Sequence, residues 1–162
     1  VSSMITTFVF LIGRMEAVNR NGAGATSGWT LGLGMGALFS MRFSVVVLDQ
    51  STSRLEGILF CIPIGLLLPW LEAQFCASHW SGMHNGKPFK SYATAILLRT
   101  LFFFIMVLIM IVYQSPWMLI LILPLLFFGQ RKADRDWLLS SLGPEALRQW
   151  HRALVKGRRD SE

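Results

Sequence analysis

The sequence predicts an all-α integral membrane protein, a small polytopic helical bundle with four transmembrane helices, and three observations support this fold class. Hydrophobic residues make up 53% of the 162-residue chain and charged residues only 15%, a composition too apolar for a soluble domain of this length. The apolar residues gather in long uncharged runs that lipid can surround. Basic residues cluster after the last of these runs, as they do on the cytosolic side of membrane proteins.

The apolar runs divide the chain into three regions. Residues 1–27 are expected to form a flexible N-terminal segment, because they end in a stretch rich in Gly, Asn and Ser. Residues 28–129 form the transmembrane helical region, and residues 130–162 form a basic cytosolic tail. The expected spans are residues 28–48, 57–75, 93–113 and 116–129.

The first two spans are separated by a short polar turn. The first is long enough to cross a hydrocarbon core of about 30 Å, and Arg42 is its only charged residue. The second contains Pro63 and Pro69, which are expected to kink it. Residues 76–91 carry polar side chains and turn residues, so they are expected to form a loop.

The last two spans come from one apolar stretch, residues 93–129, which is too long for a single ordinary span. A turn is predicted around Pro116, because Gln and Ser precede it and aromatic residues flank the turn. The span after it would be only about 21 Å long. The alternatives are two or three spans, including one long helix kinked at Pro116 with the first apolar segment lying on the membrane surface.

The distribution of basic residues predicts the orientation. With four spans, both termini and the loop containing Lys87 and Lys90 lie in the cytosol, which leaves only Arg54 outside. A compact chain with a basic cytosolic tail is typical of a bacterial inner-membrane protein. In the tail, an amphipathic helix is predicted to face anionic lipid or a partner protein, although a simply solvated helix is the alternative. Its apolar face carries Leu147, Trp150 and Leu154, and its basic face carries Arg148 and Arg152.

Small residues recur at every fourth position of the first span and form one ridge on a helix. This spacing lets two helix backbones approach closely. The ridge is therefore a helix-packing interface, which joins either a second subunit or another helix of the same chain. It comprises Gly28, Gly32, Gly36, Ser40 and Ser44.

The charged residues within the apolar runs are expected to have partners, because an unpaired charge in hydrocarbon is costly. Glu72 and Arg99 are predicted to form a structural ion pair, and Arg42 can reach Asp49 or Glu56. A weaker hypothesis is a transition-metal site. Glu72, Cys76 and His79 share one helix face, His84 follows, and these residue types are common zinc ligands.

No set of residues indicates catalysis, so the chain is expected to be neither an enzyme nor a cofactor-binding protein. A glycine-rich stretch within the first span resembles a dinucleotide-binding motif but lacks the preceding β-strand. Nucleic-acid binding is not expected, because the basic residues flank an apolar run. The expected partners are the lipid bilayer and other membrane-protein subunits, or further copies of the chain.

Three functions follow, in order of preference. The first is a small non-enzymatic subunit or accessory component of an inner-membrane complex, of the secretion or conjugation type or the exclusion or immunity type. The alternative is a small oligomeric transporter or channel that assembles through the small-residue ridge, with Arg42, Glu72 or Arg99 along the path. The third is a membrane-bound metal or redox protein.

Overall fold

The computed structural model describes residues 2–14, 24–51, 53–109, 119–120, 122–139, 145, 147–149 and 152–153, with the side chains of Ser2 and His84 excepted. The secondary structure in this part of the chain is helical, with no strand. The elements are α1 (Ser2–Gly13), α3 (Gly24–Gln50), α4 (Arg54–His84), α5 (Pro88–Leu108), α6 (Leu123–Lys132) and a π-helical turn, η3 (Ala133–Trp137).

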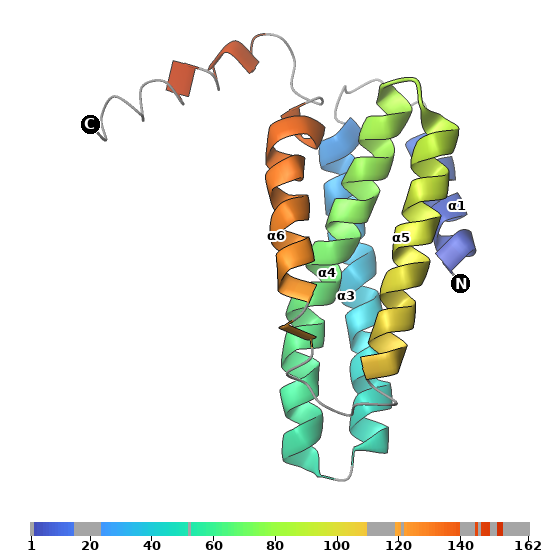
Figure 1. The fold of residues 1–162 in the computed structure, drawn as a ribbon, viewed down its shortest axis with the longest axis vertical. Helices are drawn as coiled ribbons and strands as arrows, with labels where there is room; N and C mark the ends of the chain where they lie inside the picture. The colour runs from blue at the N-terminus through green and yellow to red at the C-terminus, as the bar shows by residue number, and fades with distance from the viewer. Residues whose placement is uncertain are drawn as a thin grey trace.

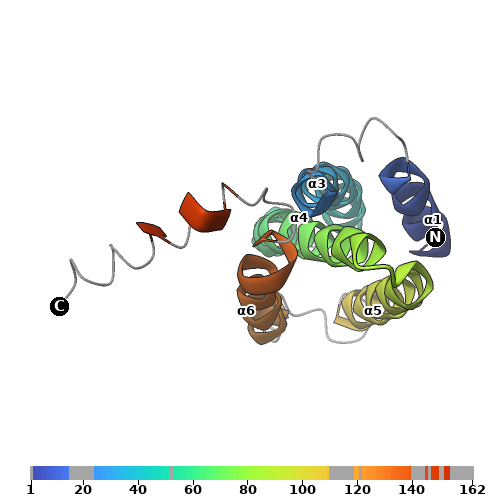
Figure 2. The ribbon, with the colours of Figure 1, turned by 90° about the horizontal axis from the view of Figure 1, so that it is seen from above.

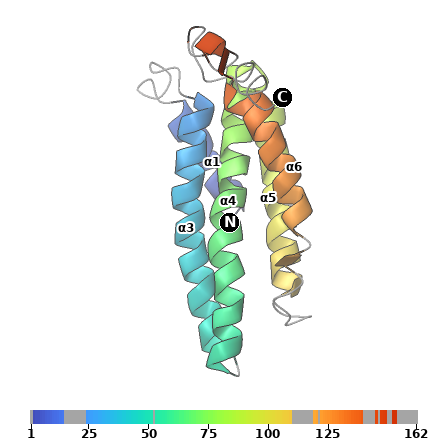
Figure 3. The ribbon, with the colours of Figure 1, turned by 90° about the vertical axis from the view of Figure 1, so that its left-hand side faces the viewer.

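The long helices run antiparallel, and α4 is the central one (Figure 1). Helices α3 and α4 form a long hairpin, α5 returns beside α4, and α6 runs antiparallel to α5. Seen from above, α3, α1, α5 and α6 surround α4, which contacts all of them (Figure 2). The short α1 packs against α3 and α5 (Figure 2), and with 12 residues against 27 in α3 it lies behind α3 and α4 in only the upper part of the bundle (Figure 3).

Three helices are long and apolar enough to cross a membrane: Gly24–Gln50, Arg54–Met83 and Pro88–Leu108. Their outer faces carry large apolar side chains such as Met41, Leu66 and Leu97, which are 70%, 69% and 68% exposed. Such faces suit lipid contact rather than water. Helix α6, with 10 residues, is too short to cross a membrane by its own length. The predicted turn at Pro116 lies outside the described residues.

Local signals in the sequence explain where the helices begin and turn. Ser53 caps the start of α4, where its hydroxyl accepts a hydrogen bond from the backbone N–H of Glu56 at 3.2 Å. The turn after α4 contains Gly86 with a φ of 72°, a left-handed conformation that glycine adopts without steric cost. Pro88 then begins α5 at a position where its missing N–H costs nothing.

Two segments differ from the sequence-based expectation. Residues Ser2–Gly13, expected to be flexible, form α1. The expected loop at residues 76–91 is largely helical, because α4 continues to His84 and α5 begins at Pro88. In both cases the physical reason is tertiary packing. Near the end of α4, the Trp80 side chain hydrogen-bonds to the backbone of α1 and the His79 side chain to Ser91 of α5, and the apolar face of α1 lies against Trp80.

The end of α6 leads directly into the tail. The π-helical turn η3, which contains Asp134, continues α6 without a break. The side-chain amide of Gln130 donates a hydrogen bond to Asp134 at 2.8 Å, which ties the turn to the last part of α6. The basic end of the bundle therefore extends beyond Lys132 as one continuous helical segment.

The main hydrophobic core lies around α4, where Ile64, Leu68 and Leu71 are fully buried. Aromatic contacts join α3 to α5, and Phe43 stacks on Phe103 with ring centroids 6.0 Å apart. Within lipid, apolar burial gives little driving force for helix association, so close packing and polar contacts must hold the bundle together.

Candidate functional site

The small-residue ridge of α3 packs against α4 of the same chain. A Cβ added at Gly28 would lie 2.8 Å from the backbone oxygen of Cys76, and one at Gly32 would lie 2.5 Å from the Cα of Ala73. At Gly36 the same atom would overlap the backbone of Pro69. Only glycine permits this approach, and the ridge is therefore an internal helix-packing interface.

The two serines extend this interface toward the hairpin turn. The Ser40 hydroxyl is buried and lies 3.2 Å from the Ile64 carbonyl oxygen and 2.8 Å from that of Gly36, to which it donates. Farther along, the Cys61 thiol approaches the backbone oxygen of Ser44 at 3.7 Å. All five ridge residues thus lie along α4, which leaves this ridge unavailable to a second subunit.

A buried ion pair joins α4 to α5. The Arg99 guanidinium donates from Nε to both carboxylate oxygens of Glu72, at 3.0 and 3.1 Å, and from Nη2 to Oε2 at 2.5 Å. Both side chains are excluded from the surface, with relative exposures of 1% and 0%. This is the ion pair that the sequence predicts, and its two-pronged geometry is the strong form of an Arg–carboxylate contact.

The remaining guanidinium contacts bring in α1. Nη1 of Arg99 donates to the Thr6 hydroxyl at 2.6 Å, and Nη2 lies 3.6 Å from the Cys76 sulfur. The guanidinium carbon also lies 5.8 Å from the ring centroid of Phe75, within range of a cation–π interaction. We call Thr6, Glu72, Cys76 and Arg99 the central polar cluster; it joins three helices.

The central polar cluster lies deeper than the sequence predicts. The expected spans put Glu72 at the end of a helix, but α4 extends to His84 and therefore places it near the helix midpoint. Arg99 lies near the middle of α5 as well. At this depth in a bilayer neither charge can reach the headgroups, so each needs the other.

A second polar group lies between the central polar cluster and the turn that joins α4 to α5. The Ser91 hydroxyl donates to the backbone oxygen of His79 at 2.9 Å and lies 3.1 Å from Nδ1 of the same residue. The His79 ring contacts Phe10 and Tyr92, at centroid distances of 5.9 and 6.1 Å. Tyr92 and Thr7 share a hydrogen bond of 2.8 Å, so this group also holds α1.

The role of α1 is not evident from the sequence. Thr6 is fully buried, and the Trp80 indole donates to the backbone oxygen of Val9 at 3.1 Å. The available signal is the apolar stretch after Thr7, which is too short for a span and falls in the segment expected to be flexible. The polar partners of α1 lie on α4 and α5, far away in the sequence.

The structure does not bring Glu72, Cys76 and His79, three of the four candidate metal ligands, together as a metal site. Arg99 contacts both Glu72 and Cys76, whereas the His79 ring is directed to Ser91. Within the described part of the chain, no three His, Cys, Asp or Glu residues form a group that could hold a metal ion. The side chain of His84 lies outside that part.

Arg42 differs from the other two intramembrane charges. It is exposed on the outer face of α3, and it does not form the expected ion pair with Asp49 or Glu56. Among residues with described side chains, the pair of Arg99 and Glu72 is the only ion pair. The expectation is wrong because Asp49 lies two helical turns away from Arg42, beyond the reach of a pair on one helix face.

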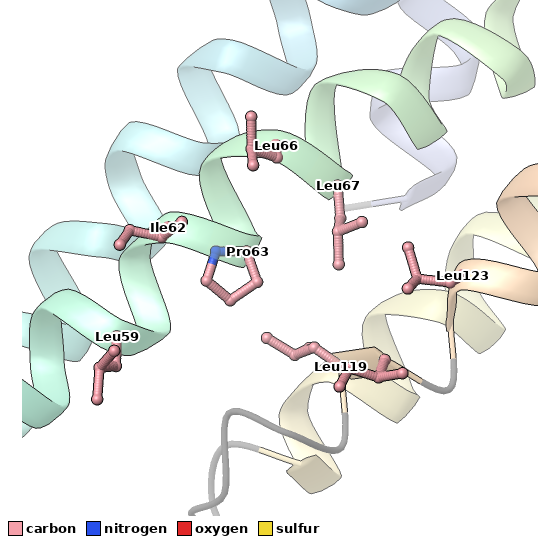
Figure 4. A pocket seen from close by; sticks show the side chains of 8 residues that line it. Leu59, Ile62, Pro63, Leu66, Leu67, Leu119 and Leu123 are labelled. Carbon is pink, nitrogen blue, oxygen red and sulfur yellow. The ribbon is translucent and has the colours of Figure 1, made fainter.

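Polar contacts also hold α6 against α4. The Gln74 amide donates to the backbone oxygen of Leu126 at 2.9 Å, and the Trp70 indole donates to the side-chain oxygen of Gln130 at 2.7 Å. Nearer the hairpin turn, α4 and the residues before α6 enclose an apolar groove of about 310 Å³ (Figure 4). Leu59, Pro63 and Leu119 are among its lining residues.

The structure describes little of the predicted tail helix. Leu147 and Arg148 lie in a short helical segment, and Arg148 and Arg152 are exposed. Trp150 and Leu154 lie outside the described residues, so the amphipathic face stays a prediction.

Together these contacts describe a polar centre that positions helices. Arg99 uses its guanidinium to connect Glu72, Thr6 and Cys76, and the surrounding side chains exclude solvent. Comparisons with family models, curated proteins and solved structures find no match to this chain.

Proposed function

We propose that this chain is a non-enzymatic subunit or accessory component of a membrane-protein complex in the bacterial inner membrane. The observation that carries the proposal is the contrast between the inside and the outside of the bundle. Inside, Glu72, Arg99 and Thr6 are fully buried and bonded to one another. Outside, the long helices present large apolar side chains.

This contrast favours a subunit over a transporter. A charge that carries a substrate or a proton faces a path and exchanges partners. Arg99 instead holds α1, α4 and α5 together through Glu72, Thr6 and Cys76. Assembly of a channel through the small-residue ridge has no support either, because α4 covers that ridge.

The packing of α6 supports a fourth span. Leu119, Ile122 and Leu126 are buried in the core around α4, and they belong to a segment that runs antiparallel to α5. Because α5 and α6 end at opposite ends of the bundle, the chain crosses the thickness of the bundle once more between them. The fourth span is therefore part of the proposal.

The charges at the two ends of the bundle support a cytosolic location for the C-terminal tail. The start of α1 lies partway along the bundle and not at its basic end (Figure 1), so these charges do not extend that support to the expected cytosolic N-terminus. The end where α4 meets α5 carries Lys87 and Lys90, and α6 brings Arg131 and Lys132 to the same end. The opposite end carries Arg54, near acidic residues. The positive-inside rule places the first end in the cytosol. There the tail that contains Arg148 and Arg152 meets anionic lipid or a partner.

The test is purification of a tagged chain in mild detergent, followed by mass spectrometry of co-purifying proteins and measurement of the complex mass. We expect a partner in fixed stoichiometry, and the identity of the partner will distinguish secretion or conjugation machinery from an exclusion or immunity system. A homo-oligomer with no other protein would contradict the proposal. In that case Glu72→Gln in liposomes would test the transporter alternative, which requires loss of flux.

A further inference from the structure

Arg42 is an unusual residue for the outer face of a membrane-spanning helix. It is exposed on α3, and its neighbours on that face are large and apolar: Leu38, Met41 and Val45 are 69%, 70% and 51% exposed. No described residue forms an ion pair or a hydrogen bond with it. A guanidinium remains charged, so this face places a cation against hydrocarbon.

The position of Arg42 along α3 makes escape to the headgroups difficult. About 10 Å of helix axis separates it from Asp49, which marks the nearer end of the helix. Side chains on an α-helix lean toward the N-terminus. For Arg42 that direction leads toward the middle of the bundle, away from Asp49 and the nearer membrane surface.

The described part of the chain offers no free carboxylate at this depth. Asp49 and Glu56 lie at the hairpin end, Glu72 is already bonded to Arg99, and the other described acidic residues lie beyond α6. Residues 110–118 and Leu121, which fall between the described parts of α5 and α6, contain no acidic residue. A second copy related by an axis along the membrane normal offers the same residues at the same depths, so self-association does not supply a partner.

From this we infer that the outer face of α3 around Arg42 docks a transmembrane helix of a different protein, and that this helix carries a carboxylate at the depth of Arg42. The inference rests on the proposed function and specifies the chemistry of the partner. An Arg–carboxylate pair removes the cost of an isolated charge and adds directional hydrogen bonds. Gly34 lies on the exposed side of α3, where the absence of a side chain leaves room for close helix approach.

The test uses photo-crosslinking side chains placed one at a time in the full-length chain in its native membrane. Leu38 and Met41 report on the face of Arg42, and Leu66 and Leu97 serve as matched controls, because they are equally exposed on α4 and α5. We expect a protein adduct from the two α3 positions, formed with a membrane helix that contains Asp or Glu. Arg42→Met should reduce this adduct at least tenfold, and Arg54→Met should leave it unchanged. Exchanging the charges, with Arg42→Glu here and Arg at the partner carboxylate, should restore it.

The outcomes separate the inference from the proposed function. Protein adducts from Leu66 or Leu97 alone would overturn the Arg42 inference and leave the subunit function standing. An adduct from α3 that persists in Arg42→Met, that lacks an acidic residue, or that contains only phospholipid would also overturn it. No protein adduct from any position would contradict both. Misfolding does not confound the test, because loss of the exposed Arg42 side chain removes no described bond, and detergent melting of the variant should match that of the parent.

Discussion

Arg99 on α5 donates a hydrogen bond to the hydroxyl of Thr6 on α1 across 93 residues of sequence. Thr6 thereby completes the central polar cluster, and α1 covers a charged pair that lipid would otherwise approach. This arrangement and the packing around it lead to four expectations that experiment can check.

The first prediction concerns the hydroxyl of Thr6. Thr6→Val keeps the shape of the side chain but leaves an Arg99 N–H without its acceptor, so we expect a loss of about 1–3 kcal/mol in stability. Amide hydrogen exchange should become faster throughout α1, whereas α3 should change little. Thr30→Val is the control, because the Thr30 hydroxyl is exposed and bonds only to its own helix. Equal effects of the two substitutions would contradict the role assigned to Thr6.

The second prediction concerns the ion pair. Glu72→Gln leaves the Arg99 charge buried without its counterion, so the free energy of unfolding in mixed micelles should fall by about 3–5 kcal/mol. Removing both charges, with Glu72→Leu and Arg99→Met together, should recover most of that loss because no isolated charge remains. Asp49→Asn, at an exposed carboxylate with no ion pair to a described residue, should have little effect. A double variant as unstable as the single one would refute a purely structural pair.

The third prediction compares two glycines on opposite faces of α3. A methyl group at Gly32 meets the backbone of Ala73 at 2.5 Å, so Gly32→Ala should destabilise the hairpin by about 1–3 kcal/mol. At Gly34 the position that a methyl group would take has no neighbouring atom within 4 Å. Gly34→Ala should therefore stabilise the helix by about 0.5–1 kcal/mol. Thermal unfolding in detergent should show melting temperatures that move in opposite directions.

The fourth prediction concerns orientation. Gln50 is the last residue of α3 and Asn85 follows the last residue of α4, so the two exposed residues lie at opposite ends of the bundle. The native cysteines are half-buried or buried, so they give a low background. A membrane-impermeant maleimide should label Gln50→Cys in intact cells and Asn85→Cys only after permeabilisation. The reverse pattern would show that the basic end faces outward, against the positive-inside rule.

The features that sequence reasoning predicts correctly depend on local pattern or on the cost of an unpaired charge. The four-residue spacing of Gly28, Gly32 and Gly36 identifies one face of α3 without knowledge of its neighbour. Glu72 and Arg99 are matched because each lies in an apolar run where a lone charge is costly. Neither argument needs the three-dimensional arrangement.

Features that depend on partners far away in the sequence are not predicted. The end of α4 reads as a loop because its polar side chains suit turns, yet His79 bonds to Ser91 and Trp80 bonds to the Val9 carbonyl. The sequence shows that these residues are polar, but it does not show which groups on other helices they hydrogen-bond to. The role of Thr6 is not predicted for the same reason, because a short apolar helix has little stability without tertiary contacts.

The order of the central polar cluster along the chain has a consequence for biosynthesis. During translation Glu72 enters the membrane before Arg99 has been made, so a nascent chain that ended after α4 would hold an uncompensated anion in hydrocarbon. Helices α4 and α5 should therefore leave the insertion machinery as a pair. Thr6, although it is synthesised first, can contact the Arg99 guanidinium only after α5 has been made, so α1 completes its docking after the insertion of α4 and α5.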